Sequence, residues 1–323
     1  MSGSLHIVVV NWNTAEYVRD CLRALAVASR DGDSIAKVTV VDNASSDGSA
    51  DNLGDADLPL DLIRNGRNVG FAAACNQGAA GSTADYLLFL NPDTRVCSGT
   101  LAAVTRFMDS GQASDIGICG AQIVGADGRP GISAARFPTL RVMLGKMTGL
   151  HRLAPRTFPE HHLDAAEMAQ STFVDQVIGA FFFVRRELFT KLGGFDERYF
   201  LYYEEVDFAL RAYRAGARSY FLKEARVFHA GNVSSSAMPA ARLHHSLRSR
   251  LLFARRHWPR PQATLLLVLT LTVEVAARLA RAVLRGSGRE LSATVFAYGT
   301  LLRELPDLAA SSRVRGTPAP TGR

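Results

Sequence analysis

Short apolar runs alternate with amphipathic segments over the first part of the chain. The apolar runs predict buried strands at Leu5–Asn11, Lys37–Asp42, Leu60–Arg64, Tyr86–Leu90 and Ile116–Val124. Segments with helical periodicity lie between them, at Ala15–Ala28, Phe71–Ala80 and Gly99–Asp109. Strands that alternate with helices predict an α/β fold in which helices cover both faces of a mostly parallel sheet.

Polar residues stand where the first two predicted strands end. Asn11 and Asn13 flank Trp12 after the first strand, and Asp42 and Asn43 end the second. Open α/β folds bind their ligands at the carboxyl ends of the strands. The aromatic face and the polar edges at this place therefore suit a nucleobase and a ribose, while ordinary strand-ending turns are the alternative explanation.

Two further segments carry groups that suit a diphosphate. Arg67 and Asn68 supply donors just before Gly70, which permits close backbone approach and opens a helix of small residues. Asn91 and Asp93 lie in an acidic turn after a buried strand. A carboxylate in that position suits a hard divalent cation that carries a diphosphate. Tight turns are again the alternative.

Acidic residues gather in the second half of the chain. Glu204, Glu205 and Asp207 lie at the start of a predicted helix, next to aromatic residues such as Phe200. Acids in a first turn favour the helix dipole, which is one explanation of all three. Carboxylates that repel each other also have raised pKa values, which suits a general base. His229 follows a short apolar strand, where a lone histidine is more often structural.

These segments together resemble the family 2 glycosyltransferases, which are inverting enzymes with the GT-A (nucleotide-diphospho-sugar transferase) fold. The motifs are VVVNWNT, VVDNASSDGS, NVGFAAACN and LNPD, in the order and spacing of that family. The likeness is strongest to the rhamnosyltransferase-like branch, which adds deoxyhexoses to polyprenyl-diphosphate-linked acceptors. It covers about Leu5–His229. The expected fold is GT-A, followed by a C-terminal helical tail.

The resemblance implies a role for each of these residues. The sugar-nucleotide pocket is expected to involve Asn11, Asn13, Asp42, Asn43, Arg67, Asn68, Gly70, Asn76 and Asn91. Asp93 and His229 are expected to hold Mg²⁺ or Mn²⁺. Glu205 is expected to be the catalytic base, with Glu204 and Asp207 as the alternatives.

The resemblance also implies a reaction: a metal-assisted single displacement that inverts the anomeric configuration. The donor is expected to be a nucleoside-diphosphate sugar, with a dTDP-sugar favoured. The acceptor is expected to be a polyprenyl-diphosphate-linked or cell-envelope glycan.

Two motifs depart from the common family pattern. Glu205 replaces the usual aspartate of a Glu-Asp pair, and Asn91 replaces the first acid of Asp-x-Asp.

The tail differs in character from the rest of the chain. The segment 241–260 has six arginines and three histidines but no acid, and an apolar run follows at Thr264–Val273. That run is shorter than the roughly 20 residues that a membrane-spanning helix needs. The composition favours helices that lie on an anionic membrane surface, and a helical hairpin packed on the protein is the alternative. The expected divisions are a catalytic domain at 1–239, a helical region at 240–310 and a disordered tail at 311–323.

Composition and motifs limit the classes of protein to which the chain could belong. The 323 residues are 47% hydrophobic, which is typical of a globular protein, and the net charge is +7. No nucleic-acid partner is expected, because no helix-turn-helix, RRM or zinc pattern appears. A nucleotidyltransferase of related fold is the alternative enzyme. Lone cysteines and an N-terminus without a signal-like segment favour a cytoplasmic protein, peripheral at the inner face of the membrane. The irregular stretch 125–172 contains Arg136 and Arg141, either acceptor contacts or solvated residues.

Overall fold

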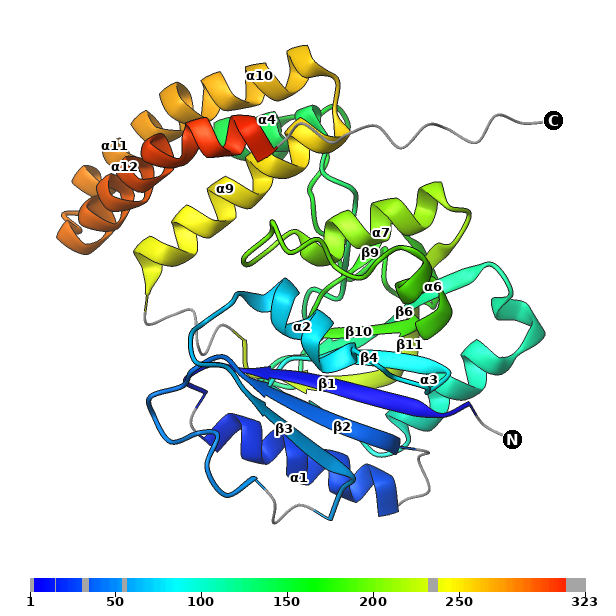
Figure 1. Cartoon of the computed structure of the whole chain (residues 1–323). Coiled ribbons are helices and arrows are strands. Elements are labelled where there is room, and N and C mark those ends of the chain that lie inside the picture. Colours follow the sequence, from blue (N-terminus) through cyan, green and yellow to red (C-terminus); the bar gives the residue numbers. More distant parts are fainter. Residues whose placement is uncertain (1–2, 15, 31–34, 54–56, 232–237, 312–323) are drawn as a thin grey trace.

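The computed structural model describes residues 3–14, 16–30, 35–53, 57–231 and 238–311, with side chains described up to residue 308. A nine-stranded sheet forms its centre, in the order β3-β2-β1-β4-β10-β6-β11-β5, with β8 paired to β11 (Figure 1). The predicted α/β fold is confirmed. The expected disordered segment at 311–323 lies outside the described residues, apart from Ser311 at the end of the last helix.

The first half of the sheet is parallel, as predicted. It consists of β1 (Leu5–Asn11), β2 (Ile35–Asp42), β3 (Leu60–Arg64) and β4 (Tyr86–Leu90). Every residue of β1 and of β4 is buried. Continuous apolar runs are typical of parallel strands that helices cover on both faces.

The second half of the sheet is mixed. β10 (Phe181–Arg185) lies antiparallel between β4 and β6 (Ile116–Val124), and β11 (Arg218–His229) is parallel to β6. The short strands β5 (Thr94–Val96) and β8 (Thr172–Val174) are antiparallel to β11. A separate pair, β7 (Ala134–Ala135) and β9 (Gln176–Val177), lies in the long connection.

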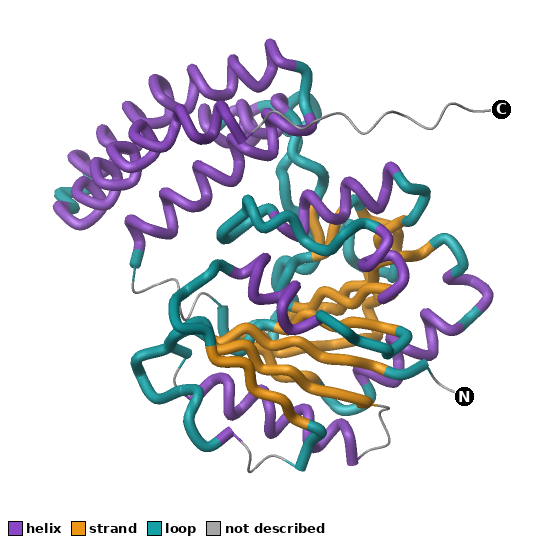
Figure 2. The backbone as a smooth tube through the Cα atoms, viewed as in Figure 1, coloured by secondary structure: helices purple, strands orange, loops and turns teal. Residues whose placement is uncertain are grey.

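Helices cover both faces of the sheet (Figure 2). On one face, α1 (Glu16–Arg30) and α3 (Thr100–Asp109) bury their apolar sides in one core cluster, and the short helix η2 (Gly111–Ala113) follows α3. On the other face, α2 (Phe71–Ala79), α6 (Arg186–Lys191) and α7 (Glu204–Arg214) form a second cluster. A Cβ at Gly78 would lie 2.4 Å from Val8, so this glycine brings α2 close to the sheet.

The C-terminal helices form a third layer of packing. They are α9 (Pro239–His257), α10 (Arg260–Leu269), η3 (Thr270–Glu274), α11 (Val275–Leu284) and α12 (Gly288–Ser311). They share a core with α4 (Leu140–Thr148), Tyr199 and Val206, and the short α5 (Leu150–Leu153) follows α4. α9 begins at Pro239, next to the predicted boundary at 239/240, and it packs against Tyr199 and Val206 of the preceding α/β part.

One expectation about the tail needs correction. The apolar helix runs without a break from Arg260 to Leu284, 25 residues with a mean hydropathy of 1.8. It continues past Glu274 because Arg250 and Arg278 pair with that carboxylate, which is buried. By length and composition alone this helix is able to cross a membrane, a test that a helix packed in a soluble protein also passes.

Candidate active site

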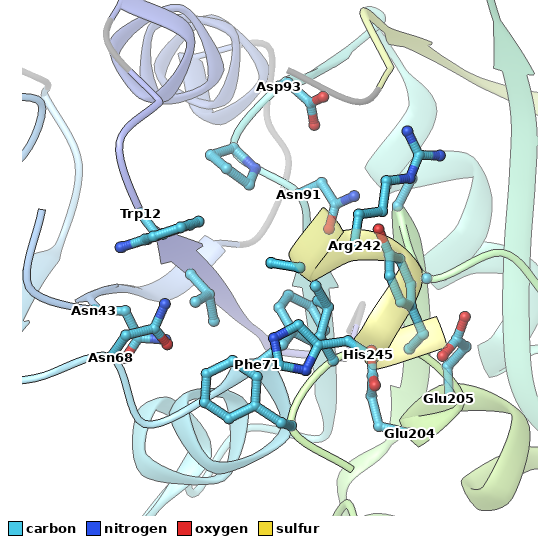
Figure 3. A pocket seen from close by; sticks show the side chains of 18 of the residues that line it. Trp12, Asn43, Asn68, Phe71, Asn91, Asp93, Glu204, Glu205, Arg242 and His245 are labelled. Carbon is cyan, nitrogen blue, oxygen red and sulfur yellow. The ribbon is translucent and has the colours of Figure 1, made fainter. Parts of the chain in front are cut away.

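A cavity of about 530 Å³ opens at the carboxyl ends of β1 and β4 (Figure 3). Its walls come from the strand ends, from the start of α7 and from the first turns of α9. Seven of the predicted site residues line it: Asn43, Asn68, Asn91, Asp93, Glu204, Glu205 and His229. These seven predicted residues therefore lie together in one cavity, and the other predicted site residues lie elsewhere.

Trp12, Asn43 and Asn68 lie on one side of the cavity (Figure 3). Asn43 Nδ2 donates to the carbonyl of Gly70 over 3.1 Å, and Asn68 Oδ1 accepts from the Gly70 amide over 2.9 Å. Gly70 itself has a φ of 91°, and a Cβ there would lie 2.7 Å from the carbonyl oxygen of Phe200. Glycine is therefore required at this close approach to Phe200, and Gly70, which was predicted for the sugar-nucleotide pocket, is not among the described residues that line the cavity.

Other predicted donor contacts support the loops behind this wall. Asn11 Nδ2 donates to Asp42 Oδ1 over 2.9 Å and to the Ser49 hydroxyl over 2.9 Å, which ties the end of β1 to the loop after β2. Asn13 Oδ1 accepts from the Ser46 amide. Asn76 bonds the backbone of Phe195 in both directions, and Arg67 is exposed. Five predicted site residues are therefore not among the described residues that line the cavity: Asn11, Asn13, Asp42, Arg67 and Asn76.

Asp93 and His229 meet at another part of the wall. The turn after β4 and the end of β11 bring Asp93 Oδ1 to 3.2 Å from His229 Nε2. A carboxylate oxygen and an imidazole nitrogen are both suitable ligands for Mn²⁺ or Mg²⁺. Within the described residues no group of three or more His, Cys, Asp or Glu side chains could hold a metal. The pair fits a metal ion only if a bound diphosphate supplies further oxygens.

Glu204 and Glu205 begin α7 after a turn in which Tyr202 and Tyr203 have positive φ values of 68° and 72°. Glu204 is 5% exposed, and one carboxylate oxygen of each glutamate is buried without a hydrogen-bond partner among the described residues. Burial raises the pKa of both carboxyls, and the charge of Glu205 raises the pKa of Glu204 further. Both carboxylates therefore hold a proton more strongly than an exposed glutamate does.

The structure does not bring Asp207 to the cavity. Its carboxylate is fully buried, lies 2.6 Å from Arg211 Nε and accepts a hydrogen bond of 2.6 Å from His257 Nε2. Burial alone would raise the pKa of Asp207, but the hydrogen bond from His257 and the charge of Arg211 hold it below its usual range. The Asp207 carboxylate therefore links α7 to α9.

Sequence reasoning missed the contribution of α9. Arg242 and His245, one turn apart on this helix, both line the cavity. The His245 ring stacks on Phe200 with centroids 4.7 Å apart, and burial lowers its pKa to about 4. Histidines within an arginine-rich segment were visible, but nothing in the sequence showed that the tail turns back to the site. Arg136 pairs with Glu167 and, like the exposed Arg141, is not among the described cavity residues.

Comparison with known proteins adds the family. Residues 6–193 match the sequence profile of glycosyl transferase family 2, which is more than half of the chain. The chain belongs to this family. It is therefore a glycosyltransferase, and two rhamnosyltransferases are among its relatives. The N-acetylglucosaminyl-diphospho-decaprenol L-rhamnosyltransferase of Mycobacterium tuberculosis is 29% identical over 80% of this chain and 86% of its own. Rhamnosyltransferase WbbL of Escherichia coli is 27% identical over 45% of this chain and 52% of its own.

Solved structures support the GT-A fold. The mannosyltransferase PcManGT of Pyrobaculum calidifontis, in complex with GDP-Man and Mn²⁺, covers 97% of this chain and 84% of its own, with a TM-score of 0.53 and 18% identity. TarS 1–349 of S. aureus, in complex with UDP-GlcNAc, covers 95% and 83%, with a TM-score of 0.52 and 18% identity. At these identities the likeness concerns the fold.

Proposed function

We propose that this glycosyltransferase moves a deoxyhexose such as rhamnose from a nucleoside-diphosphate sugar to a hydroxyl group of a lipid-linked glycan acceptor. The observation that carries the proposal is that one cavity joins the Asp93–His229 pair to the Glu204–Glu205 pair. The first pair suits a metal-bound diphosphate, and the second suits proton removal. The rhamnosyltransferase names of two relatives support rhamnose as the sugar, and we propose dTDP as the nucleotide from the resemblance of the motifs.

The donor would lie with its nucleoside against Trp12, Asn43 and Asn68. Its diphosphate would lie near Asp93 and His229, which would hold Mg²⁺ or Mn²⁺ together with the phosphate oxygens. When bound, such an ion neutralises the charge that develops on the leaving nucleoside diphosphate. Arg67, as an exposed residue outside the cavity wall, has no part in this arrangement.

The acceptor hydroxyl would lose its proton to Glu205. Its oxygen would then form a bond to the anomeric carbon as the bond from that carbon to the diphosphate oxygen breaks on the opposite face. One displacement of this kind inverts the anomeric configuration and needs no covalent enzyme intermediate. Burial raises the pKa of Glu205, and a carboxylate with a raised pKa is a stronger base than an exposed one. Glu204, the other carboxyl of the pair, would be protonated or would share one proton with Glu205.

The site would operate at the cytoplasmic face of a membrane. Large apolar side chains on the C-terminal helices are exposed, among them Val283, Leu284, Val295 and Phe296. Arginines of α10 to α12 flank them. Apolar residues beside arginines suit the boundary between acyl chains and anionic headgroups, where a lipid-linked acceptor would be found.

A thermal-shift panel of nucleoside diphosphates and nucleotide sugars, each with Mg²⁺, Mn²⁺ or EDTA, tests the donor side. A ligand that binds only the folded state raises the unfolding temperature by mass action. Metal-dependent stabilisation by dTDP or a dTDP-sugar is the expected result. Absence of a shift with every nucleotide, in all three conditions, would contradict the proposed site.

A further inference from the structure

Arg242, in the first turn of α9, lines the cavity of the candidate active site. No other lysine or arginine is among the described residues that line the cavity, and the side chain of Arg242 is half-buried. Three other arginines of α9 are in ion pairs: Arg248 with Glu304, Arg250 with Glu274 and Arg256 with Asp196. The side chain of Arg242 has no hydrogen-bond or ion-pair partner in the described part of the chain, whereas its backbone N–H donates to the Met238 carbonyl within the helix. A half-buried cation without a partner is well placed to bind an anion that comes from outside.

The acids of the cavity do not occupy this guanidinium. Asp93, Glu204 and Glu205 also line the cavity, and none of them forms a salt bridge with Arg242. Asp93 contacts His229, and each glutamate keeps a carboxylate oxygen without a partner among the described residues. The positive charge therefore remains available to a ligand.

The position of Arg242 distinguishes two possible anions. Figure 3 shows Arg242 across the cavity from Trp12 and Asn68, between the places of Asp93 and Glu205. The nucleoside side and the Asp93–His229 pair account for the donor. The acceptor must present its hydroxyl to Glu205, so an anion attached to the acceptor would reach the wall formed by α9.

The start of α9 adds to this charge. The helix has proline at its first turn and no acidic residue there, and Met238 and Ala241 line the cavity with Arg242. The N-terminal end of a 19-residue helix carries a partial positive charge that favours anions. From its other end the chain continues into the exposed apolar helices. In a ligand whose diphosphate joins a sugar to a lipid, the diphosphate would lie at the start of α9 and the lipid would lie at the exposed apolar helices.

We propose that Arg242 and the first turn of α9 bind the diphosphate of a lipid-linked acceptor and so place the acceptor hydroxyl at Glu205. This inference rests on the proposed function, because it assumes transfer to such an acceptor. The planar guanidinium forms two parallel hydrogen bonds to phosphate oxygens, which fixes orientation as well as adding affinity. His245, held against Phe200 as a neutral ring, forms the neighbouring part of the wall.

The test compares two acceptors that differ only in the diphosphate: N-acetylglucosamine joined to decyl diphosphate, and decyl N-acetylglucosaminide. In Arg242→Ala, the KM for the first acceptor should rise about 10-fold to 100-fold, as expected for loss of a charge-assisted contact. The KM values for the decyl glycoside and for the donor should stay unchanged. Arg242→Lys should lie between the wild type and the alanine variant, and Arg106→Ala, which alters an exposed arginine of α3, should behave as the wild type.

A second measurement uses decyl diphosphate as an inhibitor. It should compete with the decyl glycoside in the wild-type enzyme, and the alanine variant should lose that inhibition about 10-fold or more. If Arg242→Ala does not fold, Arg242→Gln takes its place in both assays. Equal losses with both acceptors, or a raised KM for the donor, would overturn the inference while leaving the transferase function intact. If the wild type transfers sugar to neither of the two acceptors, the proposed function is overturned, and the inference with it.

Discussion

The carboxylate of Asp207 and the imidazole of His257 lie 2.6 Å apart and join α7 to the last turn of α9. Arg214 donates to the other ring nitrogen of His257 over 3.0 Å, so Nε2 carries the proton that Asp207 accepts. The helix that contributes Arg242 to the cavity is thus fixed to the helix that bears Glu204 and Glu205. The C-terminal region is part of the enzyme's working structure.

Replacement of Asp207 by asparagine should lower the free energy of unfolding by about 3–5 kcal/mol, because it leaves Arg211 and its neighbours without a buried counter-charge. Urea unfolding measures this loss. Asp115→Asn is the control, since the Asp115–Arg218 pair is exposed at 3.9 Å and should contribute about 0–1 kcal/mol. Unchanged stability together with lost turnover would instead make Asp207 a catalytic carboxylate.

Glu205→Gln should keep nucleotide binding and lose turnover. Removal of a general base is expected to lower kcat by about 10²–10⁴-fold. Steady-state rates and thermal shifts with the nucleotide separate these two effects. Glu187→Gln, an exposed glutamate of α6, is the matched control. A near-normal rate in Glu205→Gln would move the base to Glu204.

The Glu204 carboxyl should make stability depend on pH. Burial raises its folded pKa above the ordinary value of 4.5, so its stabilising contribution is complete below pH 4.5 and is lost as pH rises through the folded pKa. Glu204→Gln removes this loss. The variant should therefore gain stability relative to the wild type as the pH increases above 4.5, measured by urea unfolding at a series of pH values. A constant difference between the two proteins across that range would contradict the raised pKa.

The sequence predicted the parallel half of the fold because its signal is local. Each of β1 and β4 is an apolar run bounded by turn residues, and the alternation with helices determines the neighbouring strands. β10 was not predicted as an antiparallel strand, because its position between β4 and β6 depends on a long connection with little periodicity. The continuous helix through Glu274 was missed for a related reason: the compensating Arg250 lies on another helix.

The candidate site residues also divide into those with a local sequence signal and those that depend on contacts between distant segments. Asp93 and the Glu204–Glu205 pair were found because each lies at the end of a strand or the start of a helix. Arg67 and Asp42 stood in equally suggestive turns, but turn sequence does not say whether a side chain points outward, inward or to its own loop. Arg242 could not be found, because its place in the cavity depends on packing between α9 and α7.

Asp93→Ala should abolish the metal-dependent part of nucleotide binding. At a nucleotide concentration about 100 times Kd, the wild type should gain about 2.7 kcal/mol of stability with Mn²⁺. The variant should gain no more than it does in EDTA. Asp127→Ala, in an exposed turn, serves as the control. A full Mn²⁺-dependent gain in Asp93→Ala would exclude this residue as a ligand.

The exposed apolar residues of the C-terminal helices should determine membrane binding. A triple variant, Leu284→Ser with Val295→Ser and Phe296→Ser, should lower partition onto anionic vesicles by about tenfold or more, since burial of each such side chain contributes about 1.5–3 kcal/mol. Co-sedimentation with vesicles measures the change. Val27→Ser, exposed on α1, should have no effect. Truncation before α9 is unsuitable, because α9 is part of the cavity wall. Unchanged sedimentation of the triple variant would contradict the membrane surface.

The most direct test of the account is to incubate the protein with dTDP-rhamnose, Mn²⁺ and N-acetylglucosamine joined to a lipid diphosphate, and to determine the product by mass and the anomeric configuration by NMR. We expect one added deoxyhexose with an anomeric configuration inverted relative to the donor, and no product in Glu205→Gln. A product that retains the donor configuration, or transfer that is unaffected in Glu205→Gln, would contradict it.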